Sequence, residues 1–230
     1  MDFFRSIWII LEKDLTTELR TKELIGSMFI FALLVIVIFN FAFEAGRDEI
    51  LLIGPGILWV AFTFSGSLGL NHAFAVEKEN NCLQGMMLAP IDRGNIYLAK
   101  VIGTTIFMYI VELMMLPIFS ILFNISIIEN LPGLLLMNGL GTIGFCAVGT
   151  TVSAVTANTK MREMMLPIIL FPLLIPLFIG VVEASSALMQ GGVMQSEEIG
   201  VFRNWVKILI GFDTLFIIVS YWIFNYILEE

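Results

Sequence analysis

Charged residues are scarce in this chain of 230 residues. Only 14% of the residues are Asp, Glu, Lys or Arg, whereas 58% are hydrophobic, and the mean hydropathy is +0.94. In a soluble domain about a quarter of the residues are charged, so lipid is the expected main solvent of this protein. The formal net charge of −8 argues against a nucleic-acid partner, because phosphate binding requires clustered Lys and Arg.

The motifs of common enzyme sites are also missing. No Gly-Lys pair is present, which excludes a Walker A loop for phosphate binding, and no Gly-x-Ser-x-Gly nucleophile elbow is present. A single His and the lack of Cys-x-x-Cys exclude the usual zinc and haem-attachment patterns. Cys82 lies in a polar loop and Cys146 in an apolar run, so we interpret both as free thiols. We therefore expect no catalytic residue, no metal site and no cofactor bound directly by this chain.

Long apolar runs dominate the rest of the sequence. A hydrocarbon core of about 30 Å requires about 20 apolar residues in a helix, and six runs meet this requirement. No domain boundary is visible, so residues 1–230 are predicted to form one transmembrane domain. The second span is expected to begin at Pro55, which suits a first helical turn. The predicted spans are 24–43, 55–76, 96–123, 131–157, 164–182 and 206–228.

An additional amphipathic helix is predicted over 2–20, before the first span. Its apolar residues recur at three- and four-residue spacing, with charged residues between them. This pattern predicts a helix that lies in the membrane interface. A soluble helix packed on a partner protein is the alternative. The apolar residues are Phe4, Trp8, Leu11, Leu15 and Leu19.

Basic residues are distributed unequally between the two sides of the predicted membrane domain. Of the twelve Lys and Arg residues, nine lie on the side of the N-terminus, and Arg47, Arg203 and Lys207 lie on the other. Lys and Arg in short loops are retained on the cytoplasmic side. Both termini are therefore predicted to be cytoplasmic.

The loop at 77–95, between the second and third spans, mixes charged and apolar residues. Its residues 82–88 predict a short helix that ends before Pro90, and Asp92 is expected to cap the third span. Methionine-rich surface is adaptable and suits docking into a partner's groove. The alternative is a segment that lies on the bilayer surface.

Glu112 is the most informative polar residue within a span. It follows Lys100 by twelve residues, about 18 Å along a helix, which places it well inside the membrane. Burying a carboxylate there costs at least about 2.5 kcal/mol, so Glu112 should face protein or a wet cavity and is a candidate functional residue. The alternative is a hydrogen bond between helices with the acid protonated. His72 is a weaker candidate, because a lone His is more often a satisfied polar tip.

Residues 54–103 resemble the CcmB family, the "haem exporter protein B" permease subunit of the cytochrome c maturation ABC transporter. The matching motifs are Pro-Gly-Ile-Leu-Trp at 55–59, the acid Glu77, Gly-x-x-Leu-Ala-Pro-Ile-Asp-Arg at 85–93, and Tyr-Leu-x-Lys at 97–100. The fourth and fifth predicted spans are similar to those of the family as well. Gln84 is a departure, because a Glu is expected there in the family.

The resemblance implies an all-α membrane protein that forms an ABC-2 (type V exporter-like) permease half, with six transmembrane helices and an N-terminal interfacial helix. It implies a multi-pass protein of the cytoplasmic (inner) membrane without ATPase activity. A separate nucleotide-binding subunit of the CcmA type, which carries ATP and magnesium, would dock on a coupling helix in 77–95. The residues implied at this contact are Glu77, Glu79, Leu83, Gln84, Gly85, Met86, Leu88 and Pro90.

The resemblance also implies a function in cytochrome c biogenesis. ATP hydrolysis on the partner would be coupled to haem delivery or to release of a haem-loaded chaperone. The further implied partners are a haem-handling membrane protein of the CcmC type, a small membrane subunit and a periplasmic haem chaperone of the CcmE type. Two alternatives stay open: an ABC-2 permease that exports a drug, lipid or glycan, and a membrane anchor or enzyme that works without ATP.

Overall fold

The computed structural model describes residues 3–43, 47–79, 85, 91–128, 130–157, 159, 161–190 and 196–227. In these residues all long elements of secondary structure are α-helices. They are α1 (Phe3–Thr21), α2 (Glu23–Ala42), α3 (Arg47–Glu79), α5 (Arg93–Leu122), α6 (Leu131–Thr156), α7 (Arg162–Gln190) and α8 (Ser196–Ile227).

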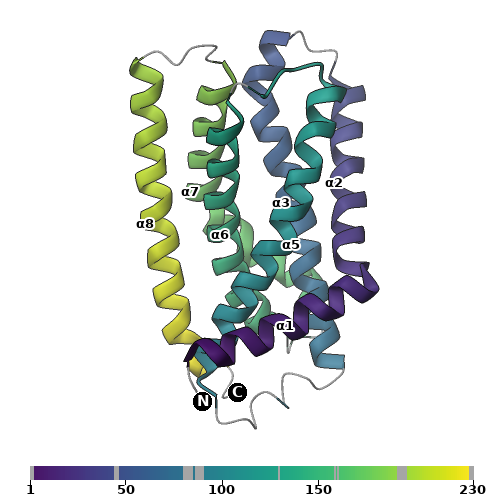
Figure 1. The fold of residues 1–230 in the computed structure, drawn as a ribbon, viewed down its shortest axis with the longest axis vertical. Coiled ribbons are helices and arrows are strands. Elements are labelled where there is room, and N and C mark those ends of the chain that lie inside the picture. Colours follow the sequence, from purple (N-terminus) through teal and green to yellow (C-terminus); the bar gives the residue numbers. More distant parts are fainter. Residues whose placement is uncertain are drawn as a thin grey trace.

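Helices α2, α3, α5, α6, α7 and α8 run side by side in one bundle, and α1 lies across one end of it (Figure 1). We call this end the α1 end. Each of the six bundle helices contains a segment long and apolar enough to cross a membrane, which confirms the six predicted spans. Helix α1 begins and α8 ends at the α1 end (Figure 1). The two termini therefore lie on the same side of the bundle, as an even number of spans requires.

Three helices extend beyond the predicted spans by about two turns or more. Helix α3 begins at Arg47, so Pro55 lies inside the helix, and the predicted start at Pro55 was eight residues late. Internal prolines are tolerated in membrane helices because neighbouring groups compensate for the missing hydrogen bond. Helix α7 continues to Gln190 and α8 begins at Ser196. Hydropathy marks only the most apolar part of a helix, and these helices continue into polar sequence.

Helix α1 has apolar residues on two faces. Phe4, Trp8 and Leu19 are exposed, whereas Ile10 and Leu11 are buried against the bundle. The predicted apolar stripe is therefore divided between an outward face and a packing face. A helix that lies across the bundle and presents aromatic side chains outward suits a membrane interface.

Helix α6 packs against α3, α5, α7 and α8. Close approach depends on its glycines. A Cβ atom at Gly141 would lie 2.2 Å from Trp59 Cη2, and a Cβ atom at Gly149 would lie 2.4 Å from Leu70 Cδ1. Such distances are too short for any side chain, so these positions require glycine for the observed packing.

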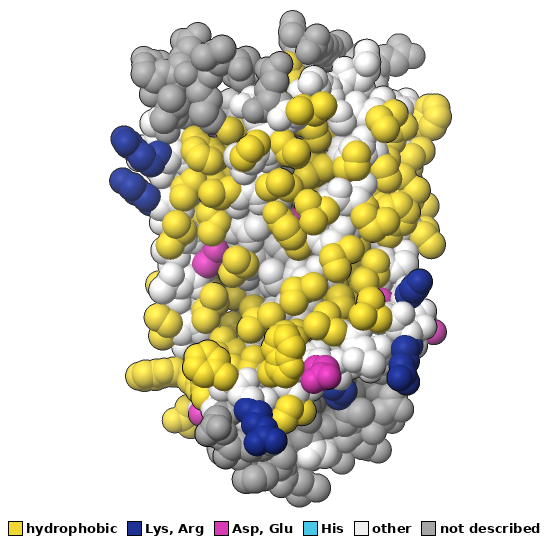
Figure 2. All heavy atoms as spheres, viewed as in Figure 1, with side chains coloured by type: hydrophobic (Ala, Val, Ile, Leu, Met, Phe, Trp, Pro, Cys, Tyr) yellow, Lys and Arg dark blue, Asp and Glu magenta, His cyan; other side chains and the backbone are white. Residues whose placement is uncertain are grey.

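The outer surface of the bundle is apolar in its middle and carries basic residues toward both ends. Apolar side chains cover the middle of the visible face, and basic side chains gather toward the α1 end (Figure 2). At the other end, Arg203 and Lys207 of α8 are exposed. Which end of the bundle faces the cytoplasm stays a prediction.

Candidate functional site

The end of α3 and the start of α5, which flank the predicted docking loop in sequence, lie at the α1 end. Glu77 and Glu79 belong to the last turns of α3. Gly85 is helical and exposed. The predicted contacts Leu83, Gln84, Met86, Leu88 and Pro90 lie outside the described residues, so the docking helix stays a prediction.

Asp92 caps the start of α5, as the sequence predicted. Its Oδ1 atom accepts a hydrogen bond from the backbone N–H of Gly94 at 3.0 Å. Its Oδ2 atom accepts a second hydrogen bond from the hydroxyl of Tyr221 on α8, at 3.1 Å. One carboxylate therefore stabilises the helix end and also holds α8 against it.

Two further contacts fix the end of α8 to the start of α5. The guanidinium Nη1 of Arg93 donates to the backbone carbonyl of Asn225 at 2.8 Å. The ring of Tyr221 packs directly on Gly94, where an added Cβ atom would lie 2.3 Å from the ring. A Cβ atom at Gly94 would displace the ring, so glycine permits this packing. All three residues of the sequence Asp-Arg-Gly at 92–94 therefore contact α8.

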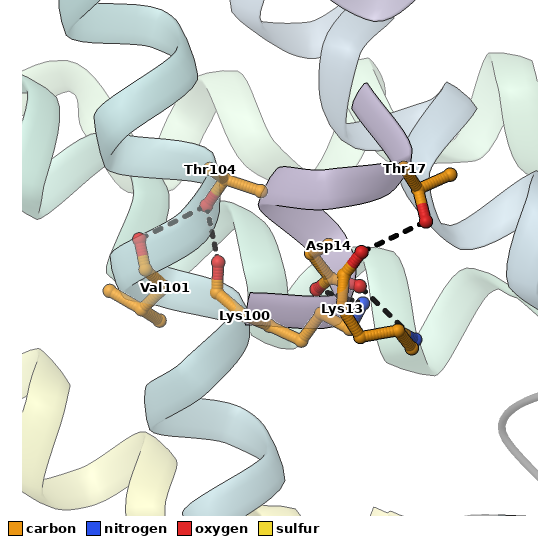
Figure 3. A network of polar contacts seen from close by, with 6 residues as sticks. All are labelled: Lys13, Asp14, Thr17, Lys100, Val101 and Thr104. Atoms are coloured by element: carbon orange, nitrogen blue, oxygen red, sulfur yellow. Dashed lines mark hydrogen bonds and ion pairs between the residues drawn. The ribbon is translucent and has the colours of Figure 1, made fainter. Parts of the chain in front are cut away.

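About two turns further along α5, Lys100 holds α1 (Figure 3). Its Nζ atom lies 2.7 Å from Asp14 Oδ2, and the Lys100 side chain is only 4% exposed. Asp14 also pairs with Lys13 at 3.1 Å. Removal of one member of a buried ion pair is strongly destabilising, so this contact fixes α1 to the bundle.

Tyr97 lies between these contacts and is fully buried. Its hydroxyl donates to the backbone carbonyl of Ala147 on α6 at 3.1 Å, and its ring lies 5.4 Å from that of Phe224 on α8. The first turns of α5 are thus bound to α1, α6 and α8. We call this set the α5 junction; it comprises Asp92, Arg93, Gly94, Tyr97 and Lys100.

Glu112, in the middle of α5, faces protein and is fully buried. The hydroxyl of Thr142 on α6 lies 2.6 Å from Glu112 Oε1 and 2.7 Å from the carbonyl oxygen of Asn138. The Thr142 hydroxyl therefore lies between the carboxyl group of Glu112 on α5 and the backbone of its own helix, and can donate to either oxygen. The second oxygen, Oε2, has no hydrogen-bond partner within the described part of the chain.

A second carboxylate, Asp213 of α8, is buried at a similar depth. Its side chain is 5% exposed, and neither of its oxygen atoms has a partner among the described residues. It faces Gly144 of α6, where an added Cβ atom would lie 2.4 Å from Asp213 Oδ1. Gly144 and Thr142 are two residues apart, about 3 Å along the helix. Glu112 and Asp213 therefore contact α6 at nearly the same height.

Comparison with known proteins identifies the family. A family model described as CcmB protein matches residues 5–228. This chain belongs to the CcmB family. The heme exporter protein B of Pseudomonas aeruginosa is 30% identical over 174 residues, which are 75% of this chain and 76% of the relative. The heme exporter protein B of Rhodobacter capsulatus is 25% identical over 173 residues, which are 74% of this chain and 78% of the relative.

The two intramembrane polar residues predicted as candidates in this CcmB-family chain, His72 and Glu112, do not lie together. His72 lies toward the α1 end of α3, where its Nε2 atom is 4.0 Å from Glu23 Oε2 and it lines a cavity. Glu112 lies in the core and does not line this cavity. In the part of the chain that the structure describes, no group of three His, Cys, Asp or Glu side chains is placed to hold a metal ion.

Sequence reasoning missed two groups in this CcmB-family chain. Asp213 carries the same signal as Glu112, an acid within an apolar span, and a search for every intramembrane acid would have found it. Tyr221 gave no signal of its own, because an aromatic residue near the end of a span is common at membrane interfaces. Its contact with Asp92 depends on a partner 129 positions away.

Proposed function

We propose that this chain is the permease subunit of an ABC transporter complex for cytochrome c maturation. In this proposal, a separate subunit hydrolyses ATP, and the permease couples hydrolysis to haem delivery or to release of a haem-loaded chaperone. The relatives in Pseudomonas and Rhodobacter bear the name heme exporter protein B, which supports the assignment. The chain itself has no Walker A motif, so the nucleotide must bind to another subunit.

In the proposed topology the α1 end faces the cytoplasm, and the protein lies in the inner membrane. The positive-inside rule supports this orientation, because nine of the twelve basic residues are predicted on that side. The loop at 77–95 is then accessible to a cytoplasmic ATPase subunit of the CcmA type. The opposite end faces the periplasm, where a CcmE-type chaperone would act with a CcmC-type membrane protein and a small membrane subunit.

The observation that carries the proposal is the position of the α5 junction. It begins within the last residues of the docking loop and contacts three other helices through side chains. A partner that moves the loop would therefore move the start of α5 and, with it, α1, α6 and α8. Coupling requires such a contiguous physical connection between a docking site and the rest of the bundle.

The experiment that tests the proposal is affinity purification of the chain in mild detergent, with mass spectrometry of the co-purifying proteins and an ATPase assay. We expect an ATPase subunit together with haem-maturation proteins. Recovery of an ATPase without haem-maturation proteins would contradict the proposed role in cytochrome c maturation. Recovery of no ATPase would contradict the assignment as an ABC transporter subunit.

The docking surface is tested with the double substitution Leu83→Asp and Met86→Asp. Charge at these positions should prevent burial in the partner's groove and abolish ATPase recruitment. A matched control is Ile128→Asp, which places the same charge at an exposed apolar residue (76% exposed) at the opposite end. Wild-type recruitment by the double variant, with normal membrane insertion, would show that docking occurs elsewhere.

The cargo is tested by deletion of the gene and spectroscopic measurement of c-type cytochromes. The proposal predicts loss of holocytochromes c, restored by the wild-type gene. Unchanged cytochromes would favour a permease for a drug, lipid or glycan and would leave the ATPase-docking test unaffected.

A further inference from the structure

A cavity of about 220 Å³ lies between α1, α2, α3 and α5 at the α1 end. Neither Glu112 nor Asp213 lines it. Figure 3 shows part of its wall, where α1 crosses α5. Its position beside an interfacial helix places it at the depth of lipid head groups and the first acyl carbons.

The cavity has a polar and an apolar part. Leu24, Ala73 and Phe107 line the apolar part. Three carboxylates and two lysine ammonium groups line the polar part, together with His72 and three threonines. The carboxylates are Asp14, Glu18 and Glu23, and the lysines are Lys13 and Lys100. An amphiphile fits this lining better than a fully polar or fully apolar ligand.

Some of the charged groups that line the cavity are paired with other groups of the protein. Lys100 is bound to Asp14 at 2.7 Å. Glu18 accepts a hydrogen bond from the backbone N–H of Ile25 at 2.8 Å and is 7% exposed. These groups build the wall and hold α1 to the start of α2. They give the cavity a fixed shape at its inner end.

Glu23 and His72 form the outer edge of the cavity. Their side chains are 68% and 39% exposed, and the nearest nitrogen and oxygen atoms are 4.0 Å apart. This distance exceeds that of a hydrogen bond. The carboxylate of Glu23, an acceptor, and the imidazole of His72, a donor, therefore lie side by side without a hydrogen bond between them. A ligand with both a cationic and an anionic group matches such a pair.

We propose that this cavity binds phosphatidylethanolamine, with Glu23 accepting hydrogen bonds from its ammonium group and His72 donating to its phosphate. The ammonium group supplies N–H donors to a lining that is rich in carboxylate oxygens. The acyl chains extend along the apolar part toward the lipid. A phosphatidylcholine head group lacks N–H donors, and an anionic phosphatidylglycerol head group meets an excess of carboxylates. This inference does not depend on the identity of the cargo.

The test uses the full chain in detergent, incubated with equal amounts of phosphatidylethanolamine, phosphatidylcholine and phosphatidylglycerol with identical acyl chains. Native mass spectrometry then counts each retained lipid. We expect phosphatidylethanolamine to be retained about tenfold more than phosphatidylcholine, which corresponds to about 1.4 kcal/mol. Equal retention of the two, or preferential retention of phosphatidylglycerol, would overturn the proposal.

The variant Glu23→Gln keeps the shape of the side chain and removes its charge. Because the Glu23 side chain is exposed, this substitution should not disturb folding, and a loss of lipid binding would report on the site itself. The variant should reduce the preference for phosphatidylethanolamine about tenfold. Glu183→Gln is the matched control, because Glu183 is an exposed acid of α7 toward the opposite end. His72→Ala should reduce retention of phosphatidylethanolamine and phosphatidylcholine alike, because both contain the phosphate. An unchanged lipid preference in Glu23→Gln would overturn the assignment of Glu23.

Discussion

The start and the middle of α5 differ in whether their polar groups have hydrogen-bond or ion-pair partners. At the start, Asp92, Arg93 and Lys100 each contact a side chain or carbonyl group of another helix. In the middle, Glu112 Oε2 and both oxygens of Asp213 on the neighbouring α8 have no partner among the described residues. The first arrangement fixes helices to one another. The second leaves polar groups buried at a cost in stability, which is typical of residues retained for function.

The largest expected effect comes from breaking the ion pair at the start of α5. Asp14→Ala removes the carboxylate beside the buried ammonium group of Lys100 and should lower the free energy of unfolding by about 3 kcal/mol. Lys13→Ala is the control, because Lys13 is 42% exposed and an exposed pair contributes less than about 1 kcal/mol. Thermal unfolding in detergent measures both. Equal effects of the two substitutions would show that burial of Lys100 does not matter.

A smaller effect is expected where α6 approaches Asp213. A Cβ atom at Gly144 would lie 2.2 Å from Leu177 Cδ1 and 2.4 Å from Asp213 Oδ1, so Gly144→Ala should cost about 1–3 kcal/mol of stability. Gly26→Ala on α2 is the control, because nothing lies within 4 Å of its added Cβ atom. That substitution should be neutral or slightly stabilising. A stable Gly144→Ala variant would contradict the close packing of α8 on α6.

The hydrogen bond between Glu112 and Thr142 is expected to contribute about 1 kcal/mol. Thr142→Val should lower stability by this amount, and Glu112→Gln should have a small effect, because an amide can still bond to the hydroxyl. A double-mutant cycle with Thr142→Val and Glu112→Leu isolates the interaction. A coupling energy near zero would mean that the two side chains do not interact in the membrane.

Removal of the Tyr221 hydroxyl should have the smallest effect on stability. Tyr221→Phe loses one hydrogen bond to Asp92 and should cost less than about 1 kcal/mol. Tyr109→Phe is the control, because it loses a bond of the same length, 3.1 Å, to the carbonyl of Leu135. If the start of α5 transmits motion, only Tyr221→Phe should reduce the ATP-dependent activity of the assembled complex. Equal activity of the two variants would show that the hydrogen bond between Tyr221 and Asp92 has no role in coupling.

Much of the fold could be predicted from the sequence, because lipid imposes a simple rule on helix length and polarity. The six spans and the Asp92 cap depend on residues that are close in sequence. The predicted burial of Glu112 is also confirmed, since an acid at that depth must face protein.

Other features could not be predicted because they depend on contacts between distant segments. Helix α3 continues before Pro55, and whether a membrane helix tolerates an internal proline depends on its surroundings, which one segment does not reveal. The fit of Tyr221 on Gly94 joins α8 to α5. The cavity at Glu23 and His72 combines four helices. In each case local sequence defines the element, and packing between elements defines the site.

The proposed coupling requires the α5 junction to pass movement of the docking loop to the rest of the bundle. The most direct measurement is ATP-driven release of the haem-loaded chaperone by the purified complex carrying Arg93→Ala and Tyr221→Phe together. We expect normal recruitment of the ATPase subunit and release of the chaperone about fivefold slower than with the wild-type permease, or slower still. A fivefold change corresponds to a coupling free energy of about 1 kcal/mol. Normal recruitment with release at the wild-type rate would contradict the proposed coupling.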